Sequence, residues 1–190
     1  MLRTAFKEWA VICKALAEGR QALILRKGGI AESGGVFTPE HARFWLYPTY
    51  VHQQRGGIKS EALPLLQSVE ADRPPGRTIR LRHFAEVTSV YFVRHLDDAL
   101  AINHLHQWSE ETVRQRFAYR EPGLYVLPVR IKRAPAPMEL PETAEYEGCK
   151  TWIQLERALS DADATPILDA RAYASILEEI EQILNPTAFA

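Results

Sequence analysis

The sequence predicts an α+β fold with a mixed, curled sheet, short flanking helices and a C-terminal helix. Three observations lead to this prediction. The 190 residues are 46% hydrophobic and 25% charged, as in ordinary globular proteins. Several short segments alternate polar and apolar residues or are rich in branched and aromatic ones, as strands are. The helices expected between them follow no regular strand-helix alternation, which argues against a doubly wound sheet.

The first part of the chain predicts a helix, a strand and a loop. Thr4 can cap a helix whose apolar residues recur at helical spacing, and Gly19 can end it. Residues 21–27 are rich in branched apolar side chains and precede two glycines, which indicates a buried strand. The loop 28–35 contains four glycines but not the spacing of a phosphate-binding loop, so we expect a turned or mobile connection, or a lid. The triplet at 38–40 is a helix-start signal.

The middle of the chain predicts two strands between short helices. A short helix is expected from Ser60. Residues 77–84 alternate polar and apolar side chains, which predicts a half-buried strand, and residues 89–93 predict a second one. Two further helices begin at Asp97 and Ser109, where acidic side chains lie at the positive end of the helix dipole.

The last third predicts a strand, a connector and a helix. Residues 124–133 have strand character, and Pro128 favours an edge or a bulge there. The proline-rich segment 134–141 is typical of a stiff, extended connector. Asp169 can cap a final helix with one apolar stripe, which Pro186 ends.

Length and composition set further limits. We expect one core domain over residues 1–155 and a helical extension over 156–190 that packs on it. The formal net charge of −1 gives no global basic field, so binding of nucleic acid would depend on a local patch. Cys13 and Cys149 are too few for a disulfide framework or a cysteine zinc site and are consistent with the cytoplasm. No apolar run reaches the roughly 18 residues of a membrane span, and no motif indicates a cofactor.

The stretch HARFWLYPTYVHQQ, residues 41–54, concentrates one Phe, one Trp, two Tyr and two His. If its first half is a strand, Arg43, Trp45 and Tyr47 lie on one face. Aromatic rings beside a guanidinium can stack a nucleic-acid base, which contributes roughly 1–3 kcal/mol per base. The alternative is that this face packs beneath a neighbouring helix as part of the core.

Pro48 makes an uninterrupted central strand improbable, so the chain is expected to bend there. A bend that carries Tyr47, Tyr50 and His52 could form the wall of a pocket. These three residues, with Arg43 and Trp45, are the predicted base-binding set.

Basic residues concentrate around the expected strands despite the neutral total. Arg80, Arg82 and Arg116 are the candidates for phosphate contacts. The alternative is a solvated sheet face whose charges are balanced by acidic helices. Lys150 and Trp152 follow the extended connector and could belong to a ligand loop, although a tryptophan that fixes the chain to the core explains them equally well.

Other chemistries have less support. His104 and His106 are two residues apart, but their setting is a helix junction without a third ligand, so no metal site is predicted. Glu86 is the main carboxylate on an expected strand, and a metal-dependent nuclease or small hydrolase that uses Glu86 and histidines stays open as an alternative. Cys13 falls on a buried stripe and Cys149 has no assignable base. A non-catalytic subunit that docks through the aromatic stretch is the third hypothesis.

Several motifs together resemble a bacterial family of unknown function, DUF1802. They are FKEWAVICKAL, LILRKGGI, FWLYPTYVHQ, HFAEVTSVYFV, HLHQWSEETVRQRF, LYVLPVRIKR and EYEGCKTWIQL, and the likeness covers roughly the first 155 residues. It implies a cytoplasmic bacterial protein without an assigned activity, with a link to restriction-modification systems.

A second resemblance concerns architecture. IRLRHFAEVTSVYFV, a short helix and LYVLPVRIKR are similar to the second half of small PUA-like β-barrels, which include ASCH and EVE domains. Such barrels bind RNA or modified bases, although GIKSE at 57–61 matches the GxKxxExR motif of ASCH domains only in part. The leading hypothesis is therefore a nucleic-acid-binding module for DNA or RNA that reads a modified or flipped base, with restriction-system proteins as partners.

Overall fold

The computed structural model describes residues 1–27, 41–148 and 150–185, and the backbone of 32–33 and 36–37. The glycines of the 28–35 loop, the helix start predicted at 38–40, Cys149 and Pro186 lie outside the described residues. Every structural statement below refers to the described part.

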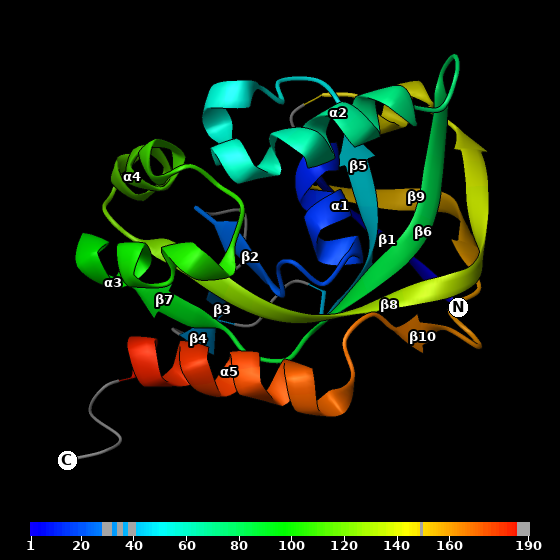
Figure 1. Cartoon of the computed structure of the whole chain (residues 1–190). Coiled ribbons are helices and arrows are strands. Elements are labelled where there is room, and N and C mark those ends of the chain that lie inside the picture. The colour runs from blue at the N-terminus through cyan, green and yellow to red at the C-terminus, as the bar shows by residue number, and fades with distance from the viewer. Residues whose placement is uncertain (28–31, 34–35, 38–40, 149, 186–190) are drawn as a thin grey trace.

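The predicted α+β class is confirmed (Figure 1). The strands are β1 Leu2–Trp9, β2 Leu23–Arg26, β3 Glu32–Ser33, β4 Val36–Phe37, β5 Arg43–Thr49, β6 Thr78–Val87, β7 Tyr91–Val93, β8 Leu124–Pro141, β9 Trp152–Leu159 and β10 Thr165–Pro166. The α-helices are α1 Ala10–Ala17, α2 Leu63–Ala71, α3 Leu96–Ala101, α4 Glu110–Ala118 and α5 Ala170–Leu184.

Eight strands form one mixed sheet, in which the order is β10-β8-β6-β5-β1-β9, while β2 and β7 also pair with β8. Strands β1 and β5 are parallel and the other pairs are antiparallel. The path begins at β10 and ends at β9, and no pairing of these two closes it among the described strands, so the sheet is an open one. β3 and β4 pair only with each other within that part of the chain.

The N-terminal helix begins later than its sequence pattern predicts. Residues before Ala10 form β1, which pairs with β5 on one side and β9 on the other, and Thr4 therefore caps no helix. Along β1, Ala5 and Phe6 point into two different hydrophobic clusters. Tertiary pairing on both edges thus overrides the local helical spacing. Gly19 follows α1 with a φ of 69°, in agreement with its predicted role as a helix stop.

The segment 134–141 is not a connector, because it continues β8 as a strand. It pairs with β6 from Thr78, opposite Pro141, to Leu81, opposite Met138. Its prolines are tolerated because only alternate residues of β8 donate backbone N–H groups to β6, and a proline can occupy the positions in between. Pro128 marks the point where β8 leaves β2 and begins to pair with β6 at Val129.

Three further local predictions agree with the structure. β6 buries Ile79 and Leu81, as its alternation predicts. The Ser109 hydroxyl caps α4 by accepting a hydrogen bond from the Thr112 backbone N–H at 3.3 Å. Asp169 caps α5 in the same way, with a 2.8 Å bond from the N–H of Ala172.

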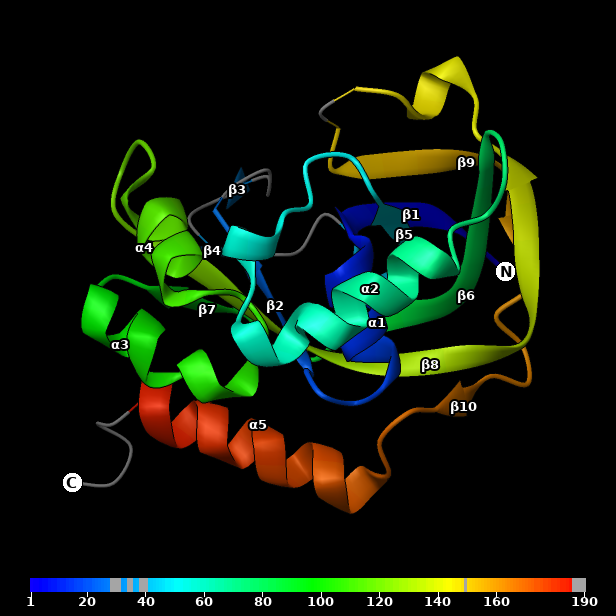
Figure 2. The same cartoon turned by 45° about the horizontal axis from the view of Figure 1, so that its top comes forward.

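Two hydrophobic clusters lie against the sheet. The first, which we call the helix-side cluster, includes Phe6, Ile12, Leu16, Phe44 and Ile180 and joins the sheet to the helices. The second, the sheet-side cluster, is built by strands β1, β5, β6, β8 and β9 and contains Trp45 and Tyr47. Figures 1 and 2 show α5 along one side of the molecule, below β8 and β7. Its Ile180 is fully buried in the helix-side cluster, and the boundary expected after residue 155 falls inside β9.

Candidate functional site

A pocket of about 410 Å³ lies where β1 and β5 end. The two strands are parallel, so their carboxyl ends meet at one edge of the sheet. β5 ends at Thr49, and His52 adopts a φ of 70°, which turns the chain away from the strand. The interruption predicted at Pro48 is wrong, because β5 runs through Pro48, which pairs with Glu8 of β1. The chain turns only after Thr49, and this turn forms one wall of the pocket. The start of β6 and the segment before β9 provide the other walls.

The aromatic side of the pocket contains Trp9, Tyr47 and Tyr50. The Tyr47 hydroxyl donates a 3.1 Å hydrogen bond to Glu142. Burial, and next the negative charge of Glu142, raise the pKa of Tyr47 far above its ordinary value, so the phenol stays protonated. Burial also raises the pKa of Tyr50, whose ring lies 4.8 Å from the Arg73 guanidinium.

The polar side of the pocket is mainly basic. Lys7, Arg73, Arg80 and Lys150 line it, against two acids, Glu142 and Glu147. The Lys7 ammonium lies 5.5 Å from the centroid of the Tyr47 ring and donates to the carbonyls of Tyr146 and Gly148.

The charges of Glu147 and Arg80 are compensated by nearby ion pairs. Arg80 forms ion pairs with Asp72 at 3.1 Å and Glu139 at 3.0 Å. Glu147 forms an ion pair with Arg77. Lys150 donates to the Glu145 carbonyl at 3.2 Å, a neutral acceptor that leaves its charge in place.

The pocket brings together half of the residues singled out from the sequence. They are Tyr47, Tyr50, His52, Arg80 and Lys150. The other five are Arg43, Trp45, Arg82, Arg116 and Trp152, and none of them lines this pocket.

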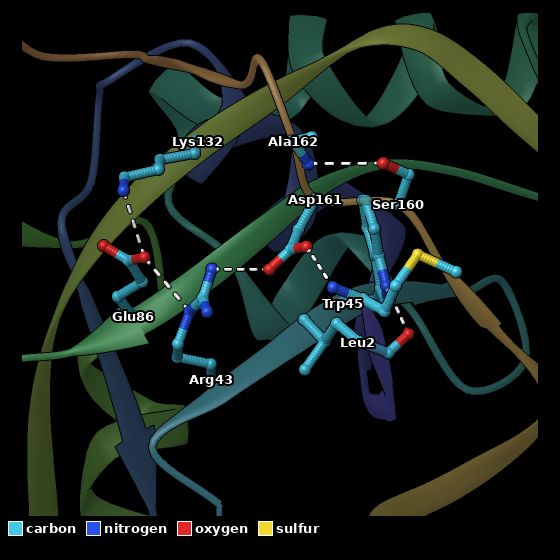
Figure 3. Close-up of polar contacts among 9 residues, drawn as sticks. Leu2, Arg43, Trp45, Glu86, Lys132, Ser160, Asp161 and Ala162 are labelled. Carbon is cyan, nitrogen blue, oxygen red and sulfur yellow. Dashed lines mark hydrogen bonds and ion pairs between the residues drawn. The ribbon is translucent and has the colours of Figure 1, made fainter.

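The prediction that Trp45 offers an open stacking face is wrong. Its side chain is 0% exposed, packs edge-on against Phe84 with ring centroids 5.2 Å apart, and donates Nε1–H to the Leu2 carbonyl at 3.1 Å (Figure 3). The physical reason is the alternation of β5, which turns Trp45 and Tyr47 into the sheet-side cluster. Tyr47 reaches the pocket because it lies near the end of the strand.

Arg43 lies at the opposite end of β5, roughly 20 Å from the pocket edge at ~3.3 Å per residue. Figure 3 shows its guanidinium between two carboxylates, Glu86 at 3.1 Å and Asp161 at 2.7 Å. Glu86 also pairs with Lys132 at 3.0 Å. Arg43, predicted as part of the base-binding set, and Glu86, the carboxylate of the hydrolase alternative, are therefore paired with each other.

The last three predicted residues lie elsewhere. Arg82 is exposed on β6. Trp152 packs against Phe6 with centroids 5.0 Å apart, as the core-packing alternative predicts. Arg116 stacks on the Trp108 ring at 3.7 Å.

Several pocket residues were missed from the sequence. Lys7 and Trp9 lie in a segment whose spacing predicts a helix, and Thr151 and Glu142 flank the segment that leads into β9. The apolar residues of LRTAFKEW follow helical and not alternating spacing, so only the register of β1 with β5 places Lys7 beside Tyr47. Arg73 carries no signal in the sequence, because its place depends on the fold of the connector before β6.

The histidine pair separates in the structure. His104 bonds Glu179 at 2.7 Å, whereas the His106 side chain is 0% exposed and neither of its ring nitrogens has a partner within the described residues. Burial, with the nearby Lys59 and Arg116 charges, lowers the pKa of His106 to about 3, so it is neutral. The described ranges contain no group of three or more His, Cys, Asp or Glu placed to hold a metal ion.

Comparisons with known proteins give one family and one group of structures. A family model described as "Domain of unknown function (DUF1802)" matches residues 5–179, which extends the likeness beyond the first 155 residues and into α5. No curated protein sequence matches the chain. Among the helices of the described ranges, none combines the length and apolarity needed to cross a membrane.

Three solved structures are similar, all of one protein. The crystal structure of ASCH from Zymomonas mobilis is 12% identical, with a TM-score of 0.46, over 92% of this chain and 93% of that chain. Two mutants of that protein are each 11% identical, with TM-scores of 0.46 and 0.45. They cover 93% and 92% of this chain, and 94% and 96% of their own.

Proposed function

The chain belongs to the DUF1802 family, and from this premise we propose that it binds nucleic acid through the pocket at the ends of β1 and β5, which takes up a single unstacked base. The observation that carries the proposal is the meeting of aromatic rings and cations in one concave site. A volume of about 410 Å³ is in the usual range for pockets that enclose a small molecule or a base. A double helix would instead need a long, exposed basic surface.

The polar groups of the pocket suit the edge of a base. The Tyr47 hydroxyl donates its proton to Glu142 and keeps a lone pair that can accept a hydrogen bond, and the carboxylates of Glu142 and Glu147 are acceptors for exocyclic amino groups. Tyr50 and Trp9 supply ring faces. Lys150 and Arg73 supply positive charge for the backbone that leads to the base.

We further propose that the base is a modified one, that restriction-system proteins are the partners, and that the protein acts in the cytoplasm. This extension follows from the resemblance of the sequence motifs, and the pocket supports it only by offering donors and acceptors that can distinguish substituents on a base.

The test is a fluorescence-anisotropy titration with labelled single-stranded and duplex oligonucleotides, with and without modified bases, at two salt concentrations. We expect tighter binding of single strands and a steep loss of affinity with salt. Lys150→Gln should weaken binding to all sequences and lower the salt slope by about 1. Arg94→Gln is the matched control, because Arg94 stacks on Phe92 outside the pocket.

Two results would reject the proposal. One is the absence of binding to any oligonucleotide. The other is binding that Lys150→Gln and Arg94→Gln change equally. Cleavage of the oligonucleotides on addition of a divalent ion would favour the nuclease alternative instead.

A further inference from the structure

Two arginines converge beside the pocket from distant parts of the chain. Arg26 is the last residue of β2 and Arg116 lies in α4. A 3.4 Å hydrogen bond from Arg116 to the Leu25 carbonyl connects the helix to the strand. Figure 2 shows α4 beside β2. Both side chains are recessed but keep part of their surface exposed, so they remain accessible from solvent.

Most of the N–H groups of these arginines have no acceptor among the described residues. Each guanidinium carries five N–H donors. Arg26 donates to Thr151 Oγ1 at 2.5 Å and Arg116 to the Leu25 carbonyl. These are the hydrogen bonds that join the two guanidiniums to described residues, and no described carboxylate lies within ion-pair distance of either. The guanidinium groups of Arg26 and Arg116 therefore both have N–H donors available for a further acceptor.

The charge of the pair is incompletely balanced. Burial is the main cause that lowers the pKa of both arginines, and the Arg116 charge lowers that of Arg26 further. Glu8, which is 5% exposed, offsets these effects from a distance. Its Oε1 accepts the Trp9 N–H at 2.8 Å, while its Oε2 is buried without a partner among the described residues. One carboxylate thus faces two cations, which favours a bound anion.

Aromatic rings hold both guanidiniums in place. Arg26 lies 4.9 Å from the centroid of the Phe6 ring, and Arg116 lies 3.7 Å from that of Trp108. Stacking orients the plane of a guanidinium and leaves its N–H edge for an oxyanion. The Trp108 Nε1–H is also buried and has no acceptor within the described chain, which adds another donor to this cluster.

The arginine pair adjoins the pocket through two shared residues. Thr151 lines the pocket and accepts the hydrogen bond from Arg26. Trp9 lines the pocket and packs against Trp108, the ring beneath Arg116, with centroids 4.8 Å apart. Arg26 therefore lies one side chain from the pocket, behind Thr151, and Arg116 lies behind Trp9 and Trp108.

We propose that Arg26 and Arg116 together bind one phosphate group, which belongs to the nucleotide whose base occupies the pocket. Two forks can share four or more hydrogen bonds with phosphate oxygens, and arginine suits this geometry better than lysine. The identity of the group that carries the phosphate rests on the proposed function, whereas the phosphate site itself does not.

The experiment is isothermal titration calorimetry with inorganic phosphate, a nucleoside 5′-monophosphate and the matching nucleoside. We expect the monophosphate to bind at least tenfold more tightly than the nucleoside. Arg26→Lys and Arg116→Lys, which keep the charge and lose the fork, should each reduce that ratio about tenfold, and Arg94→Lys should leave it unchanged.

Glu8→Gln tests the site through a gain in phosphate affinity, which partial unfolding would not produce. Because Glu8 is the acid that competes with the bound anion, its neutralisation should raise the affinity for inorganic phosphate severalfold. Circular dichroism of each variant reports whether it is folded.

The outcomes separate this inference from the proposed function. If oligonucleotides bind through the pocket but Arg26→Lys and Arg116→Lys change nothing, the phosphate site is rejected and the proposed function survives. If inorganic phosphate binds in an arginine-dependent way while oligonucleotides do not bind, the phosphate site stands and the proposed function fails. Glu8→Gln without any gain in phosphate affinity in a folded protein would also count against the site.

Discussion

Gly57 lies directly against the indole ring of Trp9. A Cβ atom on Gly57 would be 2.5 Å from Cη2 of that ring and 2.6 Å from Cζ3. Trp108 packs against Trp9 as well, with ring centroids 4.8 Å apart. The Trp9 ring is therefore confined from two directions, at the boundary between the pocket and the arginine pair.

Gly57→Ala is expected to displace Trp9 and weaken the binding of oligonucleotides severalfold. The added methyl group cannot fit against a ring that Trp108 also confines, and such overpacking costs roughly 1–3 kcal/mol of stability. Gly56→Ala is the matched control, because its Cβ would meet nothing within 4 Å. Anisotropy and urea denaturation of both variants test this, and equal behaviour of the two would contradict it.

Trp45→Ala should lower stability without changing affinity, whereas Tyr50→Ala should mainly lower affinity. Trp45 is fully buried, so its truncation should lower the free energy of unfolding by about 3–5 kcal/mol and leave the affinity of the folded protein for oligonucleotides unchanged. Tyr50 lines the pocket, so its truncation should cost roughly 1–3 kcal/mol of binding with a smaller loss of stability. Urea denaturation and anisotropy on the same samples separate the two effects, and an affinity loss in Trp45→Ala alone would contradict the assignment.

Stability should fall as the pH drops from about 6.5 towards 3. The folded-state pKa of His106 is lowered to about 3, so in this window the unfolded chain binds a proton that the folded chain does not. The contribution is at most about 4–5 kcal/mol. His83, whose pKa burial lowers to about 4, acts in the same direction.

His106→Leu isolates this effect. The pH dependence of its unfolding free energy should be shallower than that of the parent protein below pH 6.5. Identical slopes in the two proteins would show that His106 does not titrate in this way.

Tyr47→Phe should reduce oligonucleotide affinity about fivefold to tenfold, since a hydrogen bond to the phenol oxygen contributes about 1 kcal/mol. The change also leaves the Glu142 carboxylate without its phenol partner, so the pocket becomes more negative in effect. The ring and its contact with Lys7 stay in place. Binding by Tyr47→Phe at the parent affinity would remove the phenol from the proposed set of contacts.

Sequence reading succeeded where the signal is local. The caps of α4 and α5 and the alternation of β6 depend on residues a few positions apart, and all three agree with the structure. It failed for β1 and for residues 134–141, because both are extended only through their pairing with distant strands. Periodicity alone cannot report a partner that lies 40 or more residues away.

The same distinction applies to the candidate site. Tyr47, Tyr50 and His52 could be predicted as pocket residues because they lie in one short aromatic stretch at the end of β5. Lys7 enters the pocket through the parallel register of β1 with β5. Arg26 and Arg116 are 90 residues apart, and only the packing of α4 beside β2 places them near one another. No spacing rule predicts such a pair.

The 18-residue strand β8 hydrogen-bonds with β2, β6, β7 and β10. During synthesis on the ribosome, β2, β6 and β7 therefore emerge before the strand that completes them. Until β8 has left the exit tunnel, the edges of these strands that face it have no native partner and are open to association with other chains. Nascent chains that stall before β8 are therefore expected to be prone to aggregation.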